Sequence, residues 1–343
     1  MLDNIATAIE RLPALPAGRR AALDALRVHG LPTRDEEDWK YTDLSVLSQL
    51  ALDDIAPSRE NYDFPTAYDC GLDALNTALA GGCQTRTIDG RVEVDTGLHQ
   101  RLRLQVAGDA ELVLDDHTAS RFATFFAAID IAPNARLKLL RIQNAAASAQ
   151  RLTRLKIALA RDARLDAVTV DLGGGFVRHD LDVSFQAPGA EAQLHGLYLA
   201  GGAAHVDNHT RIDHRAPHCT SREIYRGIAL DKARAVFNGK IVVHPGAQKT
   251  DSEQRVANLI LSKTAEVNAK PELEIYADDV KCAHGATFGQ LDENAVFYLR
   301  SRGLDRDAAR RLLISAFAHE IIDRVGDDAT RDRVACAFEA RLG

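Results

Sequence analysis

Short runs of Val, Ile, Leu and Phe recur about every ten to fifteen residues between positions 85 and 289, and no helical pattern separates them. Turn-forming or charged residues bound each run, which is typical of β-strands. Because no helices alternate with the strands, the pattern excludes a Rossmann-like sheet and leaves a sandwich, a barrel or a β-helix. The clearest runs are residues 101–106, 111–114, 136–140, 155–159, 164–170, 235–237, 240–243 and 273–276.

A parallel β-helix fits this pattern best. The runs continue for some two hundred residues without obvious hairpin dipeptides, and aromatic residues make up only 6% of the chain. Stacked coils bury columns of aliphatic side chains and need few large rings. The repeats share little sequence identity, however, so the pattern by itself leaves a sandwich open.

The flanking regions are predicted to be helical. Residues 1–84 form a helical and mixed region with two short helices in the first thirty positions, and Trp39 is expected to anchor its segment to the main body. Residues 290–343 form three helices that begin after Asp292, after Asp305 and at Asp327 or Asp328. The middle helix is expected to carry one apolar stripe, made of Ala309, Leu312, Leu313, Ala316, Phe317 and Ile321.

Charge and composition exclude several classes of function. The net charge is −7, so we expect no nucleic-acid partner. No apolar stretch is long enough to span a membrane and the first residues do not resemble a secretory signal, so we expect a cytoplasmic protein. Five dispersed cysteines without a CxxC pair indicate free thiols. The chain contains no GxxxxGK[ST] motif, so we expect no nucleotide site.

Two groups of side chains are candidate metal ligands. In a strand from residue 205 to 213, His205, Asp207, His209 and Asp213 would share one face and could bind a divalent metal. The residues alone favour the simpler interpretation, a solvated face of a sheet with cross-strand hydrogen bonds. In a second strand, Cys282 and His284 would point the same way. Both could then reach a soft metal such as iron, with Lys281 favouring the thiolate.

Two ligands do not complete a metal site. The pair of Cys282 and His284 therefore makes sense if another chain supplies the remaining ligands, and otherwise describes a half-buried thiol with a polar neighbour.

Seven strings in the second half of the chain together resemble the SufB/SufD family of iron-sulfur cluster assembly proteins. The segment Glu37–Thr42 (EDWKYT) is similar to the N-terminal region of the SufD branch rather than the SufB branch. The strings are Arg226–Ala229, Phe237–Ile241, Gln248–Asp251, Asn258–Ser262, Ala269–Ile275, Asp278–Thr287 and Tyr298–Leu304.

The resemblance implies a right-handed parallel β-helix over residues 85–289, paired with a SufB-like sibling subunit. It implies a scaffold subunit without enzymatic activity, whose C-terminal helices bind a SufC-like ABC ATPase through residues such as Arg310, Leu313 and Phe317. It places the histidine implicated in cluster assembly at His284, with Cys282 beside it. Iron or a transient iron-sulfur cluster would bind at the interface with the sibling, and none would bind stably to the isolated chain.

Two other functions stay open from the residues alone. One is a metal-dependent β-helix enzyme of the carbohydrate lyase or hydrolase type, and the other is an iron-binding protein that acts alone. Both would use the strand that carries His205 and His209. An exposed strand edge also makes a homodimer the expected state of the isolated chain.

Overall fold

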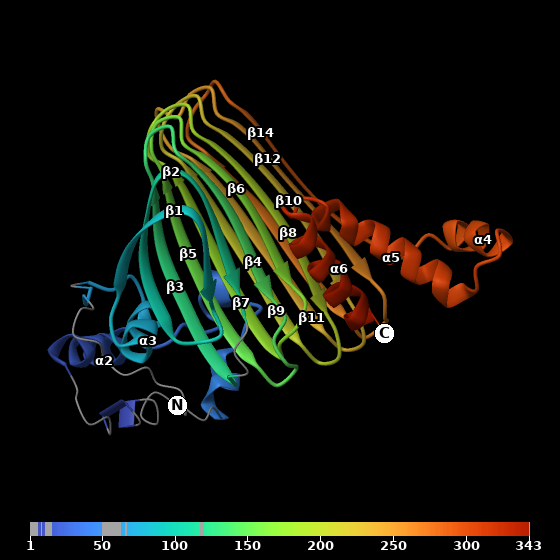
Figure 1. The fold of residues 1–343 in the computed structure, drawn as a ribbon, viewed down its shortest axis with the longest axis horizontal. Helices are drawn as coiled ribbons and strands as arrows, with labels where there is room; N and C mark the ends of the chain where they lie inside the picture. The colour runs from blue at the N-terminus through green and yellow to red at the C-terminus, as the bar shows by residue number, and fades with distance from the viewer. Residues whose placement is uncertain are drawn as a thin grey trace.

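The computed structural model describes residues 6–7, 9–10, 16–49, 63–65, 67–116 and 120–342, and its centre is a parallel β-helix (Figure 1). The described strands form a solenoid of about seven turns. They are β1 (Gln84–Asp95), β2 (Gln100–Asp115), β3 (Phe122–Ile131), β4 (Arg136–Gln143), β5 (Gln150–Leu159), β6 (Arg164–Asp171), β7 (Phe176–Phe185), β8 (Glu191–Ala200), β9 (His205–His214), β10 (Thr220–Ala229), β11 (Arg234–Val243), β12 (Asp251–Ile260), β13 (Glu266–Ile275) and β14 (Lys281–Gly289).

The solenoid has two sheet faces. Odd-numbered strands from β3 to β13 pair in sequence order on one face, and even-numbered strands from β2 to β14 pair on the other. All of these pairs are parallel. Each chain segment therefore crosses from one face to the other and returns one layer further along, which excludes the sandwich that the sequence had left open.

The strand β2 joins the two faces at the start of the solenoid. Residues 100–106 pair with β3, whereas residues 109–115 pair with β4. The sequence analysis predicted two separate strands here, at 101–106 and 111–114. The four residues between these runs, Ala-Gly-Asp-Ala at 107–110, continue the strand around the corner, and β1 pairs with β2 on both sides of it.

The turns between strands depend on residues that adopt left-handed backbone conformations. Asn134, Asp162 and Asp231 have φ values of 61°, 55° and 52°. Asn and Asp tolerate this region better than most residues because their short side chains can bond to nearby backbone. Successive turns also bond to one another: the Asn134 amide donates to the Arg161 carbonyl at 2.9 Å, so the corners stack as the strands do.

The N-terminal region covers part of the odd-numbered face. It contains α2 (Ala17–His29), the 3-10 helices η1 (Glu37–Trp39) and η2 (Leu44–Gln49), and α3 (Gly71–Ala80). The helices α2 and α3 pack with Phe122, Phe126 and Leu152 of β3 and β5. The sequence analysis missed α3 because all ten of its residues are buried, which removes the amphipathic period. The first of the two short helices expected here falls largely outside the described residues.

The three C-terminal helices begin where the sequence predicts. They are α4 (Glu293–Ser301), α5 (Arg306–Ile322) and α6 (Asp328–Leu342). The Asp292 carboxylate accepts the Asn294 amide at 2.9 Å, the Asp305 carboxylate accepts the Ala308 amide at 2.8 Å, and the Asp327 carboxylate accepts the Thr330 amide at 2.8 Å. All three predicted caps are therefore confirmed.

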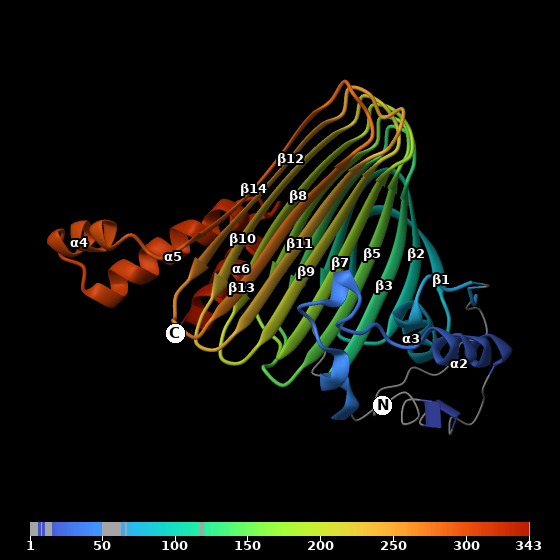
Figure 2. The same cartoon turned by 180° about the vertical axis from the view of Figure 1, so that it is seen from behind.

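The predicted apolar stripe on α5 is wrong for part of its length. Ile314, Ala318 and Ile321 pack on the even-numbered face, whereas the Leu312 side chain is 49% exposed. Figures 1 and 2 show the reason: α4 and the start of α5 project beyond the solenoid, so the first half of α5 has no sheet beneath it.

Two expectations drawn from composition can also be checked. All five cysteines are free, as their spacing predicted. Among the described residues, no helix is both long enough and apolar enough to cross a membrane.

Candidate functional site

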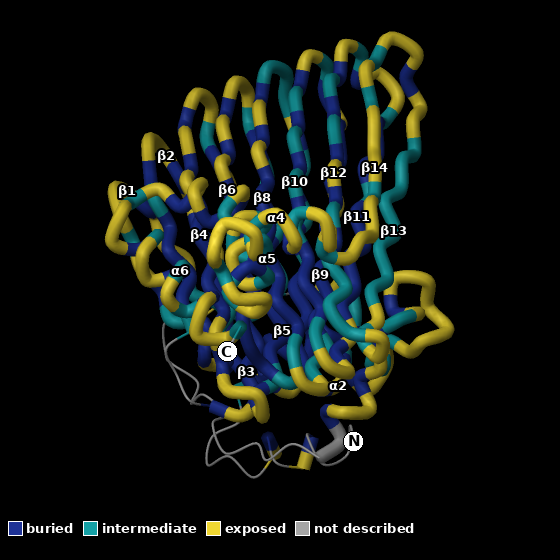
Figure 3. Tube along the Cα trace, turned by 90° about the vertical axis from the view of Figure 1, so that its right-hand side faces the viewer, coloured by how far each residue is buried: buried dark blue, intermediate teal, exposed yellow. Residues whose placement is uncertain are grey.

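The solenoid ends in an uncovered layer formed by β13 and β14. Within the described residues, no strand pairs with the outer edge of either. Most strands before them are largely buried, whereas β13 and β14 contain only intermediate and exposed residues (Figure 3). Ile275 and Phe288 lie in this layer with 42% and 50% of their surface exposed. The last layer therefore exposes backbone hydrogen-bonding groups and apolar side chains that earlier layers bury.

Cys282 and His284 lie in this last layer, on β14. Cys282 pairs in register with Ser252 of β12, and His284 pairs with Gln254. Ser252 and Gln254 are buried inside the solenoid. Side chains at paired positions of parallel strands point the same way, so Cys282 and His284 both face inward. The predicted common orientation is thus confirmed, and His284 is exposed only because no further layer covers it.

The environment of His284 is open on one side. It borders a hollow of about 380 Å³ that is also lined by Arg226, Gln254, Gly285 and Thr287. A second chain placed against this end would therefore reach the imidazole directly.

The Cys282 thiol is not activated in this chain. Burial raises its pKa, although the Ser252 backbone amide opposes the shift. The expectation that Lys281 favours the thiolate is wrong, because strand alternation places Lys281 on the opposite side of β14. Burial of Cys282 thus favours the neutral thiol, whereas a bound metal would favour the thiolate.

The strand β9 carries the other candidate group, and residues 37–42 cover it. The Thr42 hydroxyl donates to Asp207 at 2.5 Å and lies 2.9 Å from Nε2 of His205. His209 Nε2 lies 3.0 Å from the other Asp207 oxygen. Asp207 is completely buried, so this end of the predicted polar face is neither solvated nor open.

Arg178 connects this face to the N-terminal region. Its guanidinium donates to Asp207 at 2.6 Å and to the Asp38 carbonyl at 3.0 Å, and it lies 3.9 Å from the centre of the Trp39 ring. Burial alone would raise the pKa of Asp207, but Arg178 and His209 hold it well below its usual range. The predicted anchoring role of Trp39 is confirmed, because the ring is buried against a fully ion-paired arginine.

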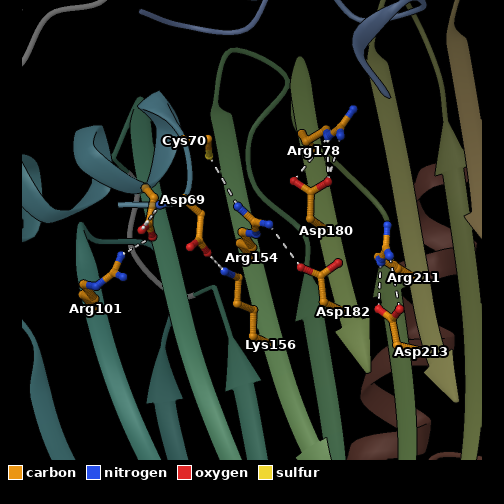
Figure 4. Close-up of polar contacts among 11 residues, drawn as sticks. Asp69, Cys70, Arg101, Arg154, Lys156, Arg178, Asp180, Asp182, Arg211 and Asp213 are labelled. Atoms are coloured by element: carbon orange, nitrogen blue, oxygen red, sulfur yellow. Dashed lines mark hydrogen bonds and ion pairs between the residues drawn. The ribbon is translucent and has the colours of Figure 1, made fainter. Parts of the chain in front are cut away.

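Further charges on the same face are also paired. A groove of about 830 Å³ crosses the strands beside the N-terminal region. Its lining includes alternating basic and acidic side chains from β5, β7 and β9 (Figure 4). The pairs are Arg154 with Asp182 at 3.2 Å, Arg178 with Asp180 at 2.8 Å, and Arg211 with Asp213 at 2.7 Å.

This pairing explains why the β9 residues do not assemble a metal site. Among residues that the structure describes, no group of three or more His, Cys, Asp or Glu side chains is arranged to hold a metal ion. His205, Asp207 and His209 bond instead to Thr42, to Arg178 and to each other.

The three residues expected to contact an ATPase differ in their surroundings. Arg310 lies 3.6 Å from Glu293 of α4, and Leu313 is half-buried. Phe317 packs near the body, with the Arg226 guanidinium 5.6 Å from its ring centre. The exposed apolar side chains of this region are Phe297, Tyr298 and Leu312, which the sequence analysis did not select as docking residues.

Comparison with known proteins identifies the class to which this fold and end layer belong. The family model described as "SUF system FeS cluster assembly, SufBD core domain" matches residues 89–317, more than half of the chain. The chain therefore belongs to the SufB/SufD family of iron-sulfur cluster assembly proteins, as its sequence motifs predicted. Members of this family are assembly scaffold subunits and are not known as enzymes.

Individual relatives place the chain near SufD. It is 35% identical over 255 residues to the iron-sulfur cluster assembly protein SufD of Escherichia coli, which covers 73% of this chain and 60% of that protein. It is 38% identical over 204 residues to a SufBD family protein of Synechocystis, covering 60% of this chain and 45% of the relative. A chloroplastic protein of Arabidopsis thaliana, ABCI7, is 33% identical over 201 residues. The matched regions span only 42% to 60% of the lengths of these three relatives.

Proposed function

We propose that this chain is the non-ATPase subunit of a SufBCD-type complex and that iron-sulfur clusters are assembled where its open end meets a SufB-like sibling. The observation that carries the proposal is the position of Cys282 and His284. They face inward in the last layer of the solenoid, where the outer edges of β13 and β14 have no strand partner within the described residues.

The open end favours another β-structured chain as its partner. Unpaired edges of β13 and β14 offer backbone donors and acceptors to an added strand. Ile275 and Phe288 offer apolar surface that such a strand would remove from water. A second copy of this chain could occupy the same edges about a twofold axis, so we propose a homodimer when the sibling is absent.

The chemistry of the pair fits a shared site. Iron in clusters is bound mainly by thiolates and in some sites by imidazoles, with several ligands in each cluster. Cys282 and His284 supply two ligands, so the remaining ones must come from the partner. In this proposal iron and sulfide are the substrates that pass through the interface.

The α4–α5 projection is the proposed docking surface for a SufC-like ATPase. Phe297, Tyr298 and Leu312 are exposed there, beside the half-buried Arg310 and Leu313. Phe317 contributes indirectly, because its contact with Arg226 and the bidentate bond from Arg226 to Glu320 fix α5 on the solenoid.

The two alternative functions lose their support on this structure. A metal-dependent β-helix enzyme and a solitary iron-binding protein both needed an accessible metal site around His205 and His209. The His205 side chain bonds to Thr42 and the His209 side chain bonds to Arg178 instead. We therefore propose neither.

The proposal is tested with a His284→Ala variant produced together with a SufB-like sibling and a SufC-like ATPase. We expect the complex to form with normal stoichiometry but to contain little iron and sulfide after cluster assembly. His29→Ala is the matched control, because His29 is an exposed histidine on α2, far from the open end. Normal iron and sulfide content in the His284→Ala complex would contradict the proposal.

A further inference from the structure

Two columns of inward-facing side chains change from aliphatic to polar just before they reach Cys282 and His284. The paired positions of the even-numbered strands define each column. The first column contains Leu139, Ala167, Leu194, Glu223, Gln254 and His284, and the second contains Leu165, Ala192, Ser221, Ser252 and Cys282.

The polar members of these columns are buried as deeply as the aliphatic ones. Glu223 and Ser252 are 1% exposed, and Gln254 and Ser221 are completely buried. Burying polar groups costs free energy that aliphatic side chains in the same space would not. Within these two columns the polar side chains all lie in the last layers before the open end, which places them directly behind Cys282 and His284.

Gln254 is held in one orientation. Its Nε2 donates to Oε2 of Glu223 in the layer behind, at 2.5 Å. This bond places Nε2 against Glu223 and directs Oε1 of Gln254 away from it. While Glu223 is ionised, a reversed amide would place two oxygen acceptors against each other. In the structure Oε1 is buried and has no hydrogen-bond partner.

Gly239 on the opposite face makes room for this arrangement. A Cβ atom at position 239 would lie 2.2 Å from Nε2 of Gln254, a distance that real Cβ atoms do not adopt. A larger residue at this position would therefore displace the amide. The bond to Glu223 therefore holds the Gln254 amide, and the absence of a side chain at Gly239 leaves the room that this position of the amide requires.

We propose that Gln254 is a positioning residue for His284: its Oε1 accepts a hydrogen bond from one imidazole N–H, and Glu223 holds the amide ready to do so. This inference rests on the proposed function of His284. Adjacent strands lie about 4.8 Å apart, so a side chain at a paired position is within reach of the orphaned oxygen. With one ring nitrogen engaged, the other presents its lone pair toward the open end, where iron and the sibling would meet it.

The neighbouring column does not offer Cys282 the same support. The hydroxyls of Ser221 and Ser252 lie 2.6 Å apart, and Ser221 also lies 2.9 Å from Nε2 of His214. These hydroxyls already have partners inside the solenoid. The proposal therefore concerns the imidazole alone.

The tautomer of His284 tests the proposal without iron or a partner. The full chain is labelled with ¹⁵N-histidine, and the two ring nitrogens are assigned by loss of their signals in His284→Ala. We expect the ratio of the two neutral tautomers to change about fivefold in Gln254→Leu, as expected when one hydrogen bond is lost. Gly239→Ala, which displaces the amide without altering a polar group, should shift the ratio in the same direction.

Asn258→Leu is the matched control, because Asn258 is another buried amide on β12 but pairs in register with Phe288 and bonds to Tyr198. It should leave the His284 ratio unchanged. An unchanged ratio in both Gln254→Leu and Gly239→Ala, with circular dichroism showing folded chains, would overturn the inference. So would an equal shift in the control.

Different results would refute the positioning role of Gln254 and the proposed function of the chain. Normal cluster content in the His284→Ala complex would contradict the function while leaving the tautomer measurement intact. A tautomer ratio that ignores Gln254 would contradict the positioning role even if His284→Ala abolished assembly.

Discussion

Replacing Asp207 by alanine should release residues 37–42 from the solenoid. The carboxylate accepts hydrogen bonds from Arg178 and Thr42 and lies 3.0 Å from His209, and it is completely buried. Its removal leaves Arg178 buried with one carboxylate partner fewer, and it leaves Thr42 without its acceptor. Trp39, which stacks on Arg178, should therefore lose its fixed surroundings.

The free-energy cost of the substitution depends on the partners that Arg178 keeps. Removing one partner of a buried ion pair usually costs about 3–5 kcal/mol. Arg178 keeps Asp180 at 2.8 Å, so we expect the lower end, about 3 kcal/mol. That value corresponds to a change on the order of 100-fold in the equilibrium between the docked and released segment.

Fluorescence of Trp39 measures this release without interference, because it is the only tryptophan in the chain. We expect a red-shifted emission and stronger quenching by acrylamide in Asp207→Ala. Asp213→Ala is the control, because Asp213 lies on the same strand and the same face but bonds to Arg211 and His244. Unchanged Trp39 emission in folded Asp207→Ala, or the same change in the control, would refute the reasoning.

Four further predictions concern pH, stability and docking. Arg178 and His209 lower the pKa of Asp207 although burial opposes them. The ionised carboxylate therefore stabilises the fold fully above the unfolded-state pKa of about 3.9, and this stabilisation is lost as pH falls further. Trp39 emission should shift only below about pH 4. Burial raises the pKa of Glu223 to about 7. The free energy of unfolding should therefore fall by roughly 3 kcal/mol as pH rises from about 4.5 to 7. Urea denaturation of Glu223→Gln should show no such dependence on pH. Phe338→Ala should lower the free energy of unfolding by about 3–5 kcal/mol in the same urea assay, because the ring is completely buried between α6 and the even-numbered face. A decrease of less than about 1 kcal/mol would contradict that packing. Leu312→Asp should weaken capture of a SufC-like ATPase at least tenfold, whereas Val28→Asp, at an even more exposed apolar site on α2, should not. Equal capture by both variants would contradict the docking surface.

The fold could be predicted from the sequence where a local pattern, either hydrophobic periodicity or a helix cap, determines the element. Strands were evident from aliphatic runs, and the caps at Asp292 and Asp305 located two helices. Hydrophobic periodicity failed to predict α3, because the complete burial of this helix removes the period. It also failed at Leu312, whose exposure depends on α5 extending past the sheet. Both failures arise from tertiary surroundings that a local pattern does not contain.

The candidate site was accessible from the sequence only in part. The two-residue period of a strand placed Cys282 and His284 together, and family motifs selected them. That period cannot say which residue of another strand lies behind each one, so Gln254 and Glu223 were missed. The same limit applies to Asp207: the sequence showed its strand but not that Arg178 and Thr42, far away in the chain, would enclose it.

Hydrogen exchange along β14 tests most directly whether another chain completes the open end of the solenoid. The amides of β14 that do not bond to β12 should exchange rapidly in the isolated chain under conditions that keep it monomeric. Adding a SufB-like sibling should protect them strongly, while amides at the exposed start of α5 stay unchanged until the ATPase is added. Rapid exchange along β14 in a stable complex with the sibling would contradict the account.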